Sequence, residues 1–239
     1  MLNSLQWPRV EVRIWLPLVY TAVVMILLYY CGKTPHAFAF FPELFARFDD
    51  RAELDFYGKI YWVIFGIVFY FIIPWIFIRL AGDRLRDYGV RLPSSYGHLW
   101  IYVAMLLAVV VMAYFASFQE SFLRTYPYYS YFREEPLYYG LFWAGRAVRF
   151  FALEFFFRGY LLFSLKRKFG DASFFVSMVP YCMLHFGKPM AETVFAVVGG
   201  IIFCWIAART KSIWGAVVLH VCLALAMDFF AILQKLGYL

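Results

Sequence analysis

The stretch from residue 60 to residue 78, which reads IYWVIFGIVFYFIIPWIFI, decides the fold class of this chain. It contains no charged side chain, and a helix needs about 20 predominantly apolar residues to cross the hydrocarbon core of a bilayer. Pro74 lies inside the run, and a lipid-embedded helix tolerates the kink we expect there when a neighbour satisfies the freed carbonyl. The stretch therefore predicts a membrane-spanning helix.

The composition of the whole chain agrees with this prediction. Its 239 residues are 64% hydrophobic and only 15% charged, whereas an ordinary soluble domain is about half apolar and a quarter charged. This excludes a disordered chain, a collagen-like fibre and a nucleic-acid-binding domain with an open basic face. The net charge of +7 fits basic residues retained at the cytoplasmic ends of membrane helices. We therefore expect the lipid bilayer, and no nucleic acid, as a partner.

Apolar segments recur along the chain and predict an all-α, polytopic transmembrane helix bundle of about 7–8 spans. We interpret residues 1–239 as a single integral membrane domain. The fifth segment is short, so we expect it to end inside the bilayer, and an eighth short or re-entrant helix is expected at residues 43–52. The seven segments are residues 14–31, 60–78, 99–118, 137–165, 173–185, 193–208 and 213–233.

Basic residues indicate the orientation of the bundle. Arg9 and Arg13 precede the first span, and further clusters follow the second, fourth and sixth spans, at residues 79–91, 166–168 and 209–211. In a seven-span chain these positions fall on one side, and the positive-inside rule makes that side cytoplasmic. We predict a multi-pass protein of the cell (inner or cytoplasmic) membrane with its N-terminus in the cytoplasm.

Ionisable residues inside the predicted spans concentrate in the C-terminal half, at about residues 137–233. Such residues are costly in a membrane and usually face the bundle interior or a water-filled cavity. They are Arg146, Arg149, Glu154 and Arg158 in the fourth span, His185 at the end of the fifth, and His220 and Asp228 in the seventh. This half is therefore where we expect chemistry.

Glu154 and Arg158 lie four residues apart, on one face of a helix, and the pair could also be a self-neutralised ion pair that helps the span to insert. Gly159 follows them and lets another backbone approach closely. Counted from the cytoplasmic ends at 1.5 Å per residue, Glu154, His185 and His220 lie about 17, 18 and 10 Å deep. The three side chains could therefore meet on the cytoplasmic half of the membrane.

One carboxylate and two imidazoles in a dry pocket suit the activation of water. Glu154 can take a proton from water as a general base, and His185 and His220 can stabilise the oxyanion and protonate the leaving amine. Two histidines and a glutamate are also a catalytic zinc set, but the sequence has no HExxH pair. We expect no cofactor, with zinc held by Glu154, His185 and His220 as the weaker alternative.

At these residues the chain resembles the CPBP family, the CAAX proteases and bacteriocin-processing membrane proteins also called the Abi family. The first family motif is similar to Leu153–Gly159, the second to Tyr181–His185 and the third to His220–Ala224. The resemblance implies a CAAX-protease-like bundle and a glutamate-dependent intramembrane endopeptidase. It implies that Glu154 activates water, that Arg158 positions it, and that His185 and His220 hold the oxyanion.

The chain departs from the family pattern at two positions. Leu153 replaces the first glutamate of the motif, and Ala224 stands where the third motif has asparagine. Asp228 and Tyr181 are possible supporting residues, but Asp228 lies about 12 Å beyond His220 along the helix axis. The departures leave open an active variant and a protein that has lost peptidase activity, and we favour the active variant.

We therefore predict an intramembrane endopeptidase that cleaves a membrane-anchored or lipid-modified protein, or a hydrophobic peptide. One alternative is a catalytically inactive membrane scaffold or immunity-type protein of the same fold, which the changes at Leu153 and Ala224 would suit. Another is a small ion-coupled transporter that uses Glu154 and Asp228. The absence of an internal repeat in the sequence counts against the transporter.

Overall fold

The computed structural model describes residues 11–94 and 96–239, and helices are the only regular elements in these ranges. The described chain starts with α1 (Val12–Tyr30), the short α2 (Thr34–Phe40) and α3 (Pro42–Phe45), and α4 (Arg51–Ile67). The π-helical η1 (Val68–Ile72) joins α4 to α5 (Ile73–Leu80). The short η2 (Leu85–Tyr88), α6 (Leu99–Ala116) and α7 (Glu120–Thr125) follow.

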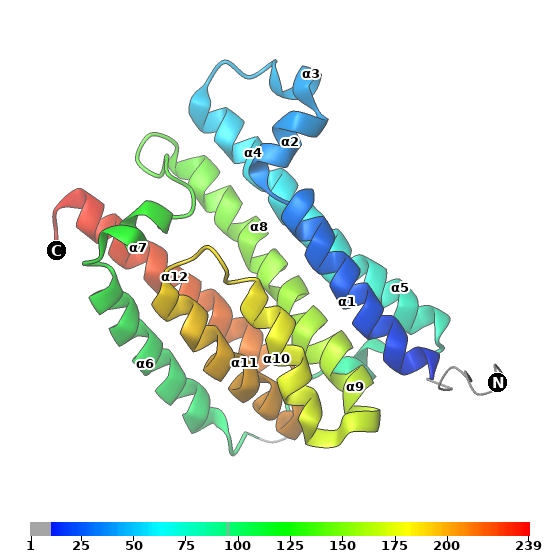
Figure 1. Cartoon of the computed structure of the whole chain (residues 1–239). Helices are drawn as coiled ribbons and strands as arrows, with labels where there is room; N and C mark the ends of the chain where they lie inside the picture. The colour runs from blue at the N-terminus through cyan, green and yellow to red at the C-terminus, as the bar shows by residue number, and fades with distance from the viewer. Residues whose placement is uncertain (1–10, 95) are drawn as a thin grey trace, which may run out of the picture.

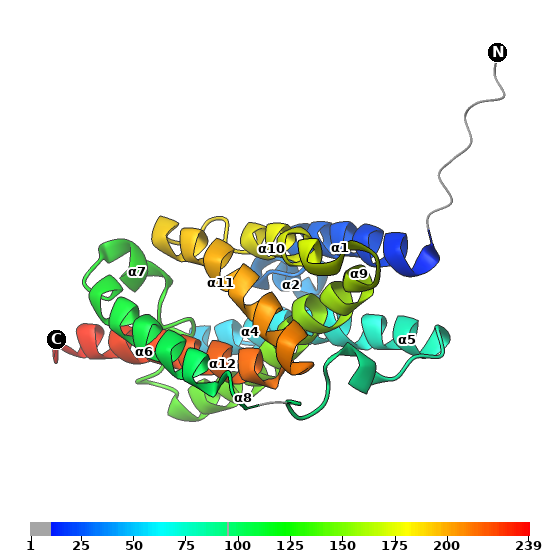
Figure 2. The ribbon, with the colours of Figure 1, turned by 90° about the horizontal axis from the view of Figure 1, so that it is seen from below.

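The C-terminal half contains a second long helical path. It runs through α8 (Pro136–Glu154), the π-helical η3 (Phe155–Leu161) and α9 (Leu162–Phe169). After the short η4 (Gly170–Ala172) come α10 (Ser173–Met183), α11 (Met190–Thr210) and α12 (Trp214–Leu236). In Figure 1 this second path crosses the middle of the bundle, and in Figure 2 α1 and α10 lie in one layer while α4, α8 and α12 lie in the other.

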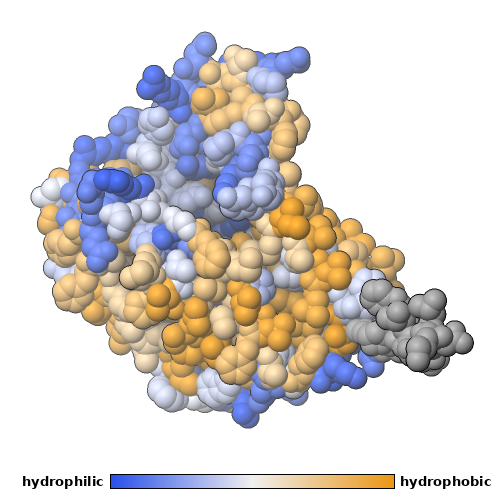
Figure 3. Space-filling view, viewed as in Figure 1, coloured by the Kyte–Doolittle hydropathy of each residue, from blue (hydrophilic) through white to orange (hydrophobic). Residues whose placement is uncertain are grey.

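The predicted all-α membrane bundle is confirmed. Among the described residues, five helices are long and apolar enough to cross a membrane: Val12–Tyr30, Arg51–Leu80, Leu99–Ala116, Met190–Thr210 and Trp214–Leu236. The α8–η3–α9 path, from Pro136 to Phe169, is longer than any of these helices, but its charged side chains make it less apolar. The helix α10 is shorter, with only 11 residues. Figure 3 shows an apolar band across one face, with polar residues at both ends.

Pro74 and its neighbours show how the second span accommodates a missing amide hydrogen. The π-helical turn η1 ends just before Pro74, and in such a turn the amide of residue 74 would pair with the carbonyl of Phe69. That carbonyl instead accepts a hydrogen bond from the hydroxyl of Tyr20 on α1, at 2.7 Å. The freed backbone group is thus satisfied by a neighbouring helix, as a membrane interior requires.

The short helix expected at residues 43–52 has different bounds. Residues 34–45 form α2 and α3, and α4 begins at Arg51. Asp50 separates them because its carboxylate accepts hydrogen bonds from the amides of Ala52 and Glu53, which starts a new helix. The sequence prediction was wrong here because this N-cap was not recognised.

Asp83 ties three of the predicted basic segments together at one end of the bundle. It lies 3.6 Å from Arg13 of α1 and 3.2 Å from Arg167 of α9, and it accepts a hydrogen bond from Tyr88 of η2 at 2.9 Å. Figure 1 places the C-terminus at the opposite end. Arg9, which also entered the orientation argument, lies outside the described residues.

Candidate active site

Glu154 is the last residue of α8, and its side chain is completely buried. Its Oε1 atom lies 2.6 Å from Nδ1 of His220, a residue 66 positions further along the chain, on α12. A carboxylate can only accept hydrogen bonds, so Nδ1 carries the hydrogen and Nε2 is the remaining ring nitrogen. The antiparallel packing of α8 on α12 therefore brings together two of the residues that the sequence singled out.

Arg158 lies in the π-helical segment η3 and is also completely buried. Its Nε atom is 3.2 Å from Oε2 of Glu154, an ion-pair distance without the angle of a hydrogen bond. The guanidinium carbon stands 3.9 Å from the ring centre of Tyr181. Within the described chain, Oε2 of Glu154 and all three nitrogens of Arg158 have no hydrogen-bond partner.

The π-helical geometry of η3 was not foreseen from the sequence, which predicted an ordinary α-helical pair. All seven residues of η3 are buried, and such π-helical turns occur often at functional sites. Gly159 has the predicted role, because a Cβ at this position would lie 2.7 Å from the carbonyl oxygen of Tyr88. The missing side chain lets η2 pack directly against the segment that carries Arg158.

His185 follows α10, and its position is set by the backbone. Its Nδ1 lies 3.1 Å from the carbonyl oxygen of Tyr181, and its own carbonyl accepts a hydrogen bond from the hydroxyl of Thr193 at 2.8 Å. His185 interacts electrostatically with Glu154 and with His220 but has no hydrogen bond to either. It therefore borders the Glu154 centre from the α10 side.

His220 and His185 are the more accessible members of the group. The side chain of His220 is 12% exposed, whereas those of Glu154 and Arg158 are at 0%. The His220 ring stacks on Phe150 of α8, with ring centres 4.3 Å apart and planes 29° apart. Phe150 lies one helical turn before Glu154, so the same helix supplies the hydrogen-bond acceptor and the stacking surface that hold this imidazole.

Asp228 is not part of this cluster. Its Oδ2 atom lies 2.9 Å from Nη1 of Arg146, and its Oδ1 accepts a hydrogen bond from the amide of Tyr128 at 3.3 Å. Arg149 faces another direction, because its guanidinium stacks 3.5 Å from the ring centre of Trp62 on α4. The polar residues of α8 thus contact two neighbouring helices: Arg146 and Glu154 form separate hydrogen bonds to α12, with Asp228 and His220, whereas Arg149 contacts α4.

Residues 136–226 match the family model described as Type II CAAX prenyl endopeptidase Rce1-like. This segment, which is less than half of the chain, is similar to the CAAX protease family. The match starts at the first residue of α8 and ends within α12, so it includes Glu154, Arg158, His185 and His220 and leaves out Asp228. A search of curated proteins and a search of solved structures each found no match.

The two positions where this chain departs from the motif pattern lie in apolar packing. Leu153 is 7% exposed and belongs to the main hydrophobic cluster. Ala224 is 4% exposed and packs with Trp143 and Phe150. Glu154 is therefore the acidic group that contacts Arg158 and His220, without a second carboxylate at position 153.

The donor geometry does not fit a zinc ion bound by Glu154, His185 and His220. Nδ1 of His220 is engaged with the Glu154 carboxylate, and Nδ1 of His185 with the Tyr181 carbonyl of α10, so each ring could offer a metal only its Nε2 atom. In residues 11–94 and 96–239, no group of three or more His, Cys, Asp or Glu side chains is arranged to hold a metal ion. The three side chains thus contact one another or the backbone rather than a common central point.

Two residues near the centre were missed from the sequence. Phe150 could have been found because it precedes Glu154 by four positions and therefore shares its helix face. Tyr102 of α6 interacts electrostatically with Glu154, but it lies in a span that carries no other polar signal. Only the packing of α6 against α12 brings it near the site.

Proposed function

We propose that this chain is an intramembrane endopeptidase in which Glu154 activates a water molecule. One observation carries the proposal: in a fully buried site, Oε2 of Glu154 is an unoccupied acceptor beside the unpartnered donors of Arg158. Buried polar groups are nearly always hydrogen-bonded, and an orphaned set calls for a water or a ligand. A water beside the pair that donates to Oε2 and accepts from the Arg158 guanidinium would be oriented for reaction.

The proposed reaction uses each group in the way its contacts allow. His220 holds Oε1, so Oε2 is the oxygen that takes the proton from water, as a general base. The water oxygen attacks the scissile carbonyl carbon, and Arg158 positions that water. His185 and His220 stabilise the oxyanion in their protonated form, in which Nε2–H donates to it while Nδ1–H stays with its present acceptor. The C–N bond then breaks, and the proton held by Glu154 passes to the leaving amine.

The burial pattern indicates the direction from which the substrate approaches. Glu154 and Arg158 form the closed side of the site, and the partly exposed histidines form the open side. Excluding bulk water strengthens the electrostatic interactions within such a site. The matching family model, which describes a CAAX prenyl endopeptidase, supports a lipid-modified or membrane-anchored protein, or a hydrophobic peptide, as the substrate. We place the cleaved bond near the membrane end of that substrate.

The same proposal includes a location. Basic residues from α1 and α9 gather at one end of the bundle around Asp83, and the positive-inside rule places such an end in the cytoplasm. The chain would then be a multi-pass protein of the cytoplasmic membrane with its N-terminus inside. A cysteine-accessibility assay on intact cells, with a reporter cysteine at Lys168, tests this orientation.

Glu154→Gln tests the reaction. The purified protein, in lipid nanodiscs, is given quenched fluorogenic peptides that end in an S-prenylated cysteine and three further residues. Loss of the general base should lower kcat/KM by about 10²–10⁴-fold. Glu120→Gln is the control, because that carboxylate is 79% exposed on α7. Equal turnover by wild type and Glu154→Gln would refute the proposed chemistry.

A second candidate is a membrane scaffold or immunity-type protein that binds a hydrophobic peptide without cleaving it. The apolar packing of Leu153 and Ala224 favours it, because these are the motif positions where polar residues are missing. In that case Glu154→Gln would keep full biological activity in a cell-based complementation assay. The transporter alternative gains no support, because Asp228 is engaged by Arg146.

A further inference from the structure

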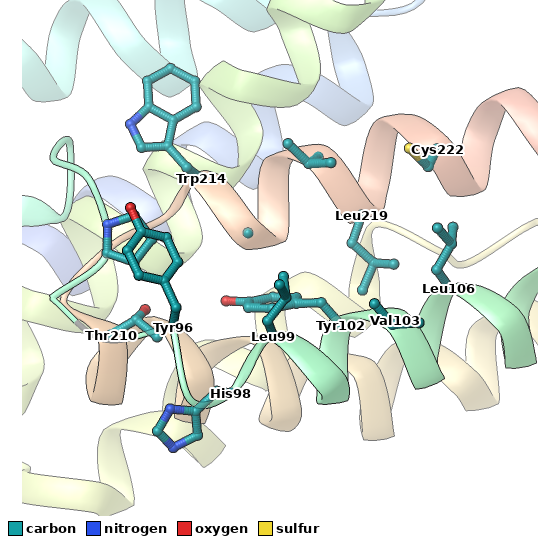
Figure 4. Close-up of a pocket in the computed structure, with 13 residues that line it drawn as sticks. Tyr96, His98, Leu99, Tyr102, Val103, Leu106, Thr210, Trp214, Leu219 and Cys222 are labelled. Atoms are coloured by element: carbon teal, nitrogen blue, oxygen red, sulfur yellow. The ribbon is translucent and has the colours of Figure 1, made fainter.

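A separate apolar pocket lies between α6 and α12, with a volume of about 320 Å³. Figure 4 shows side chains from the two helices facing each other across it. The apolar walls include Leu99, Val103 and Leu106 from α6 and Val218, Leu219 and Cys222 from α12. Val103 and Val218 are 49% and 59% exposed, so the pocket opens sideways toward the surrounding bilayer.

Tyr102 and Gly215 form one wall of the pocket. A Cβ at Gly215 would lie 2.2 Å from Cζ of Tyr102, so the glycine allows the tyrosine ring to rest against the backbone of α12. Tyr102 also interacts electrostatically with Glu154. The pocket therefore lies along the part of α12 that carries His220, the residue after Leu219 of the pocket wall.

Two chain segments, residues 91–94 and 210–212, form the end of the pocket nearest the basic loops, and hydrogen bonds join them. The amide of Ser94 donates to the carbonyl of Thr210 at 2.9 Å, and the hydroxyl of Ser212 donates to the carbonyl of Arg91 at 2.7 Å. Pro93 and Thr210, which line the pocket, belong to these segments. The hydrogen bonds hold residues 91–94 beside residues 210–212 and fix the shape of the opening.

Arg91, Arg209 and Lys211 belong to or directly adjoin the two segments that form this end of the pocket, and they are exposed. They form no ion pair with any carboxylate of the described chain, although Arg209 interacts electrostatically with Asp171 at a longer distance. Some other basic residues at the same end are paired, Arg13 and Arg167 with Asp83 and Lys166 with Asp171, whereas Arg79, Arg84 and Lys168 form no ion pair in the described chain. Positive charge is thus left unbalanced where the apolar pocket meets the membrane surface.

We propose that this pocket binds one hydrocarbon chain of an anionic phospholipid, with the lipid phosphate held by Arg91, Arg209 and Lys211. The apolar walls match the chain, and the lateral opening lets it enter from the bilayer. Basic residues at the membrane surface attract anionic lipids, and here the segments that carry them are held in place by hydrogen bonds. The site does not depend on peptide cleavage.

Native mass spectrometry tests the site on protein taken from vesicles of equal parts phosphatidylglycerol and phosphatidylcholine. Wild type should retain phosphatidylglycerol in preference to phosphatidylcholine. Val218→Phe fills the pocket and should lose the bound lipid. Val111→Phe is the matched control, because Val111 is 54% exposed on α6 and does not line the pocket. Lipid retention by Val218→Phe equal to that of wild type would overturn the proposal.

The headgroup contact is tested by the triple variant Arg91→Gln/Arg209→Gln/Lys211→Gln. Its preference for phosphatidylglycerol over phosphatidylcholine should fall about tenfold or more, whereas Lys168→Gln, at the same end of the bundle, should keep the wild-type preference. An unchanged preference in the triple variant would refute headgroup recognition.

If Val218→Phe fails to fold, phospholipid with brominated chains provides a second readout, because it should quench Trp214 in the pocket wall. Equal quenching in wild type and Trp214→Phe would contradict the proposal.

Discussion

The Glu154 centre and the Arg146–Asp228 pair join the same two helices, α8 and α12, and both are buried. They differ in how their polar atoms are satisfied. Both oxygens of Asp228 accept hydrogen bonds, from Tyr128 and from Arg146. Oε2 of Glu154 accepts none from the described chain. The two centres thus contain similar groups, but only the Glu154 centre leaves a carboxylate oxygen without a partner in the described chain, which can accept a hydrogen bond from a ligand.

The two arginines show the same contrast. Nη1 of the Arg146 guanidinium donates to Asp228, Nε is its one fully buried nitrogen without a hydrogen-bond partner in the described chain, and four aromatic rings surround it at 4.7–5.9 Å. All three nitrogens of Arg158 are left unpartnered there. A buried ion pair in a membrane span therefore does not by itself mark a catalytic site. The unsatisfied donors and acceptors beside partly exposed histidines distinguish the Glu154 centre.

Asp228→Asn should give the largest effect on stability. Removing one partner of a buried ion pair leaves the other charge uncompensated, which costs about 3–5 kcal/mol. The free energy of unfolding, measured by denaturant titration in detergent, should fall by this amount. The double variant Arg146→Met/Asp228→Leu should recover most of the loss, because apolar residues of similar volume often replace buried ion pairs without cost. A double variant as unstable as Asp228→Asn would mean that the pair does more than balance charge.

Glu154→Asp tests the other of the two buried centres, by moving its carboxylate. The change keeps the negative charge beside Arg158 but withdraws the carboxylate by one methylene, and a misplacement of about 1 Å can cost 10²-fold in rate. We expect kcat/KM to fall by about this factor while the melting temperature stays close to wild type. Activity near the wild-type level would show that the position of this carboxylate is not critical.

The apolar runs allowed most of the fold to be predicted, because the length of a span is set by the thickness of the bilayer. The run expected at residues 99–118 is α6, Leu99–Ala116, and the short fifth segment is α10. The π-helical turns η1 and η3 could not be predicted, because they depend on tertiary packing around Pro74 and Gly159. The same holds for Asp50, whose side-chain cap divides the chain before α4.

The sequence was enough to predict which residues form the candidate site, but not which of them contact one another. Axial distances along the helices indicated that Glu154 and His220 could meet, and they lie in hydrogen-bond contact. The same arithmetic placed Asp228 about 12 Å beyond His220, and it contacts Arg146 instead. Which residue of α8 faces which residue of α12 depends on the rotation of both helices, and no local pattern in either helix specifies that rotation.

Phe150→Leu tests a residue that lies on α8 between Arg146 of one centre and Glu154 of the other. Its ring stacks on His220, and such an aromatic contact contributes about 0.5–1.5 kcal/mol, so its loss should lower kcat up to about tenfold with little change in KM. Phe150→Tyr should restore the rate. Phe151→Leu is the matched control, because that ring contacts Trp214 and Phe71 instead. Equal rate losses in the two leucine variants would argue against a positioning role for Phe150.

Substitution of Asp83 should give the smallest effect on stability. This carboxylate lies outside the membrane-spanning segments, unlike Glu154 and Asp228. Burial acts to raise the pKa of this carboxyl, but the Tyr88 hydroxyl and the guanidinium groups of Arg167 and Arg13 outweigh it, so the pKa lies below its ordinary value of 3.8. A lowered pKa in the folded state means that the ionised carboxylate stabilises the fold above pH 4 and that this contribution is lost as the pH falls through the lowered pKa.

Asp83→Asn should therefore melt a few degrees below wild type at pH 7, and the gap should close as the pH falls below about 4, where the unfolded carboxyl is protonated. Glu134→Gln, an exposed carboxylate without an ion pair in the described chain, should match wild type throughout. A gap that does not depend on pH would assign the effect of Asp83 to packing rather than to charge. Since Asp83 joins α1, η2 and α9 outside the bilayer, water screens it, and its contribution is smaller than that of the buried pairs between α8 and α12.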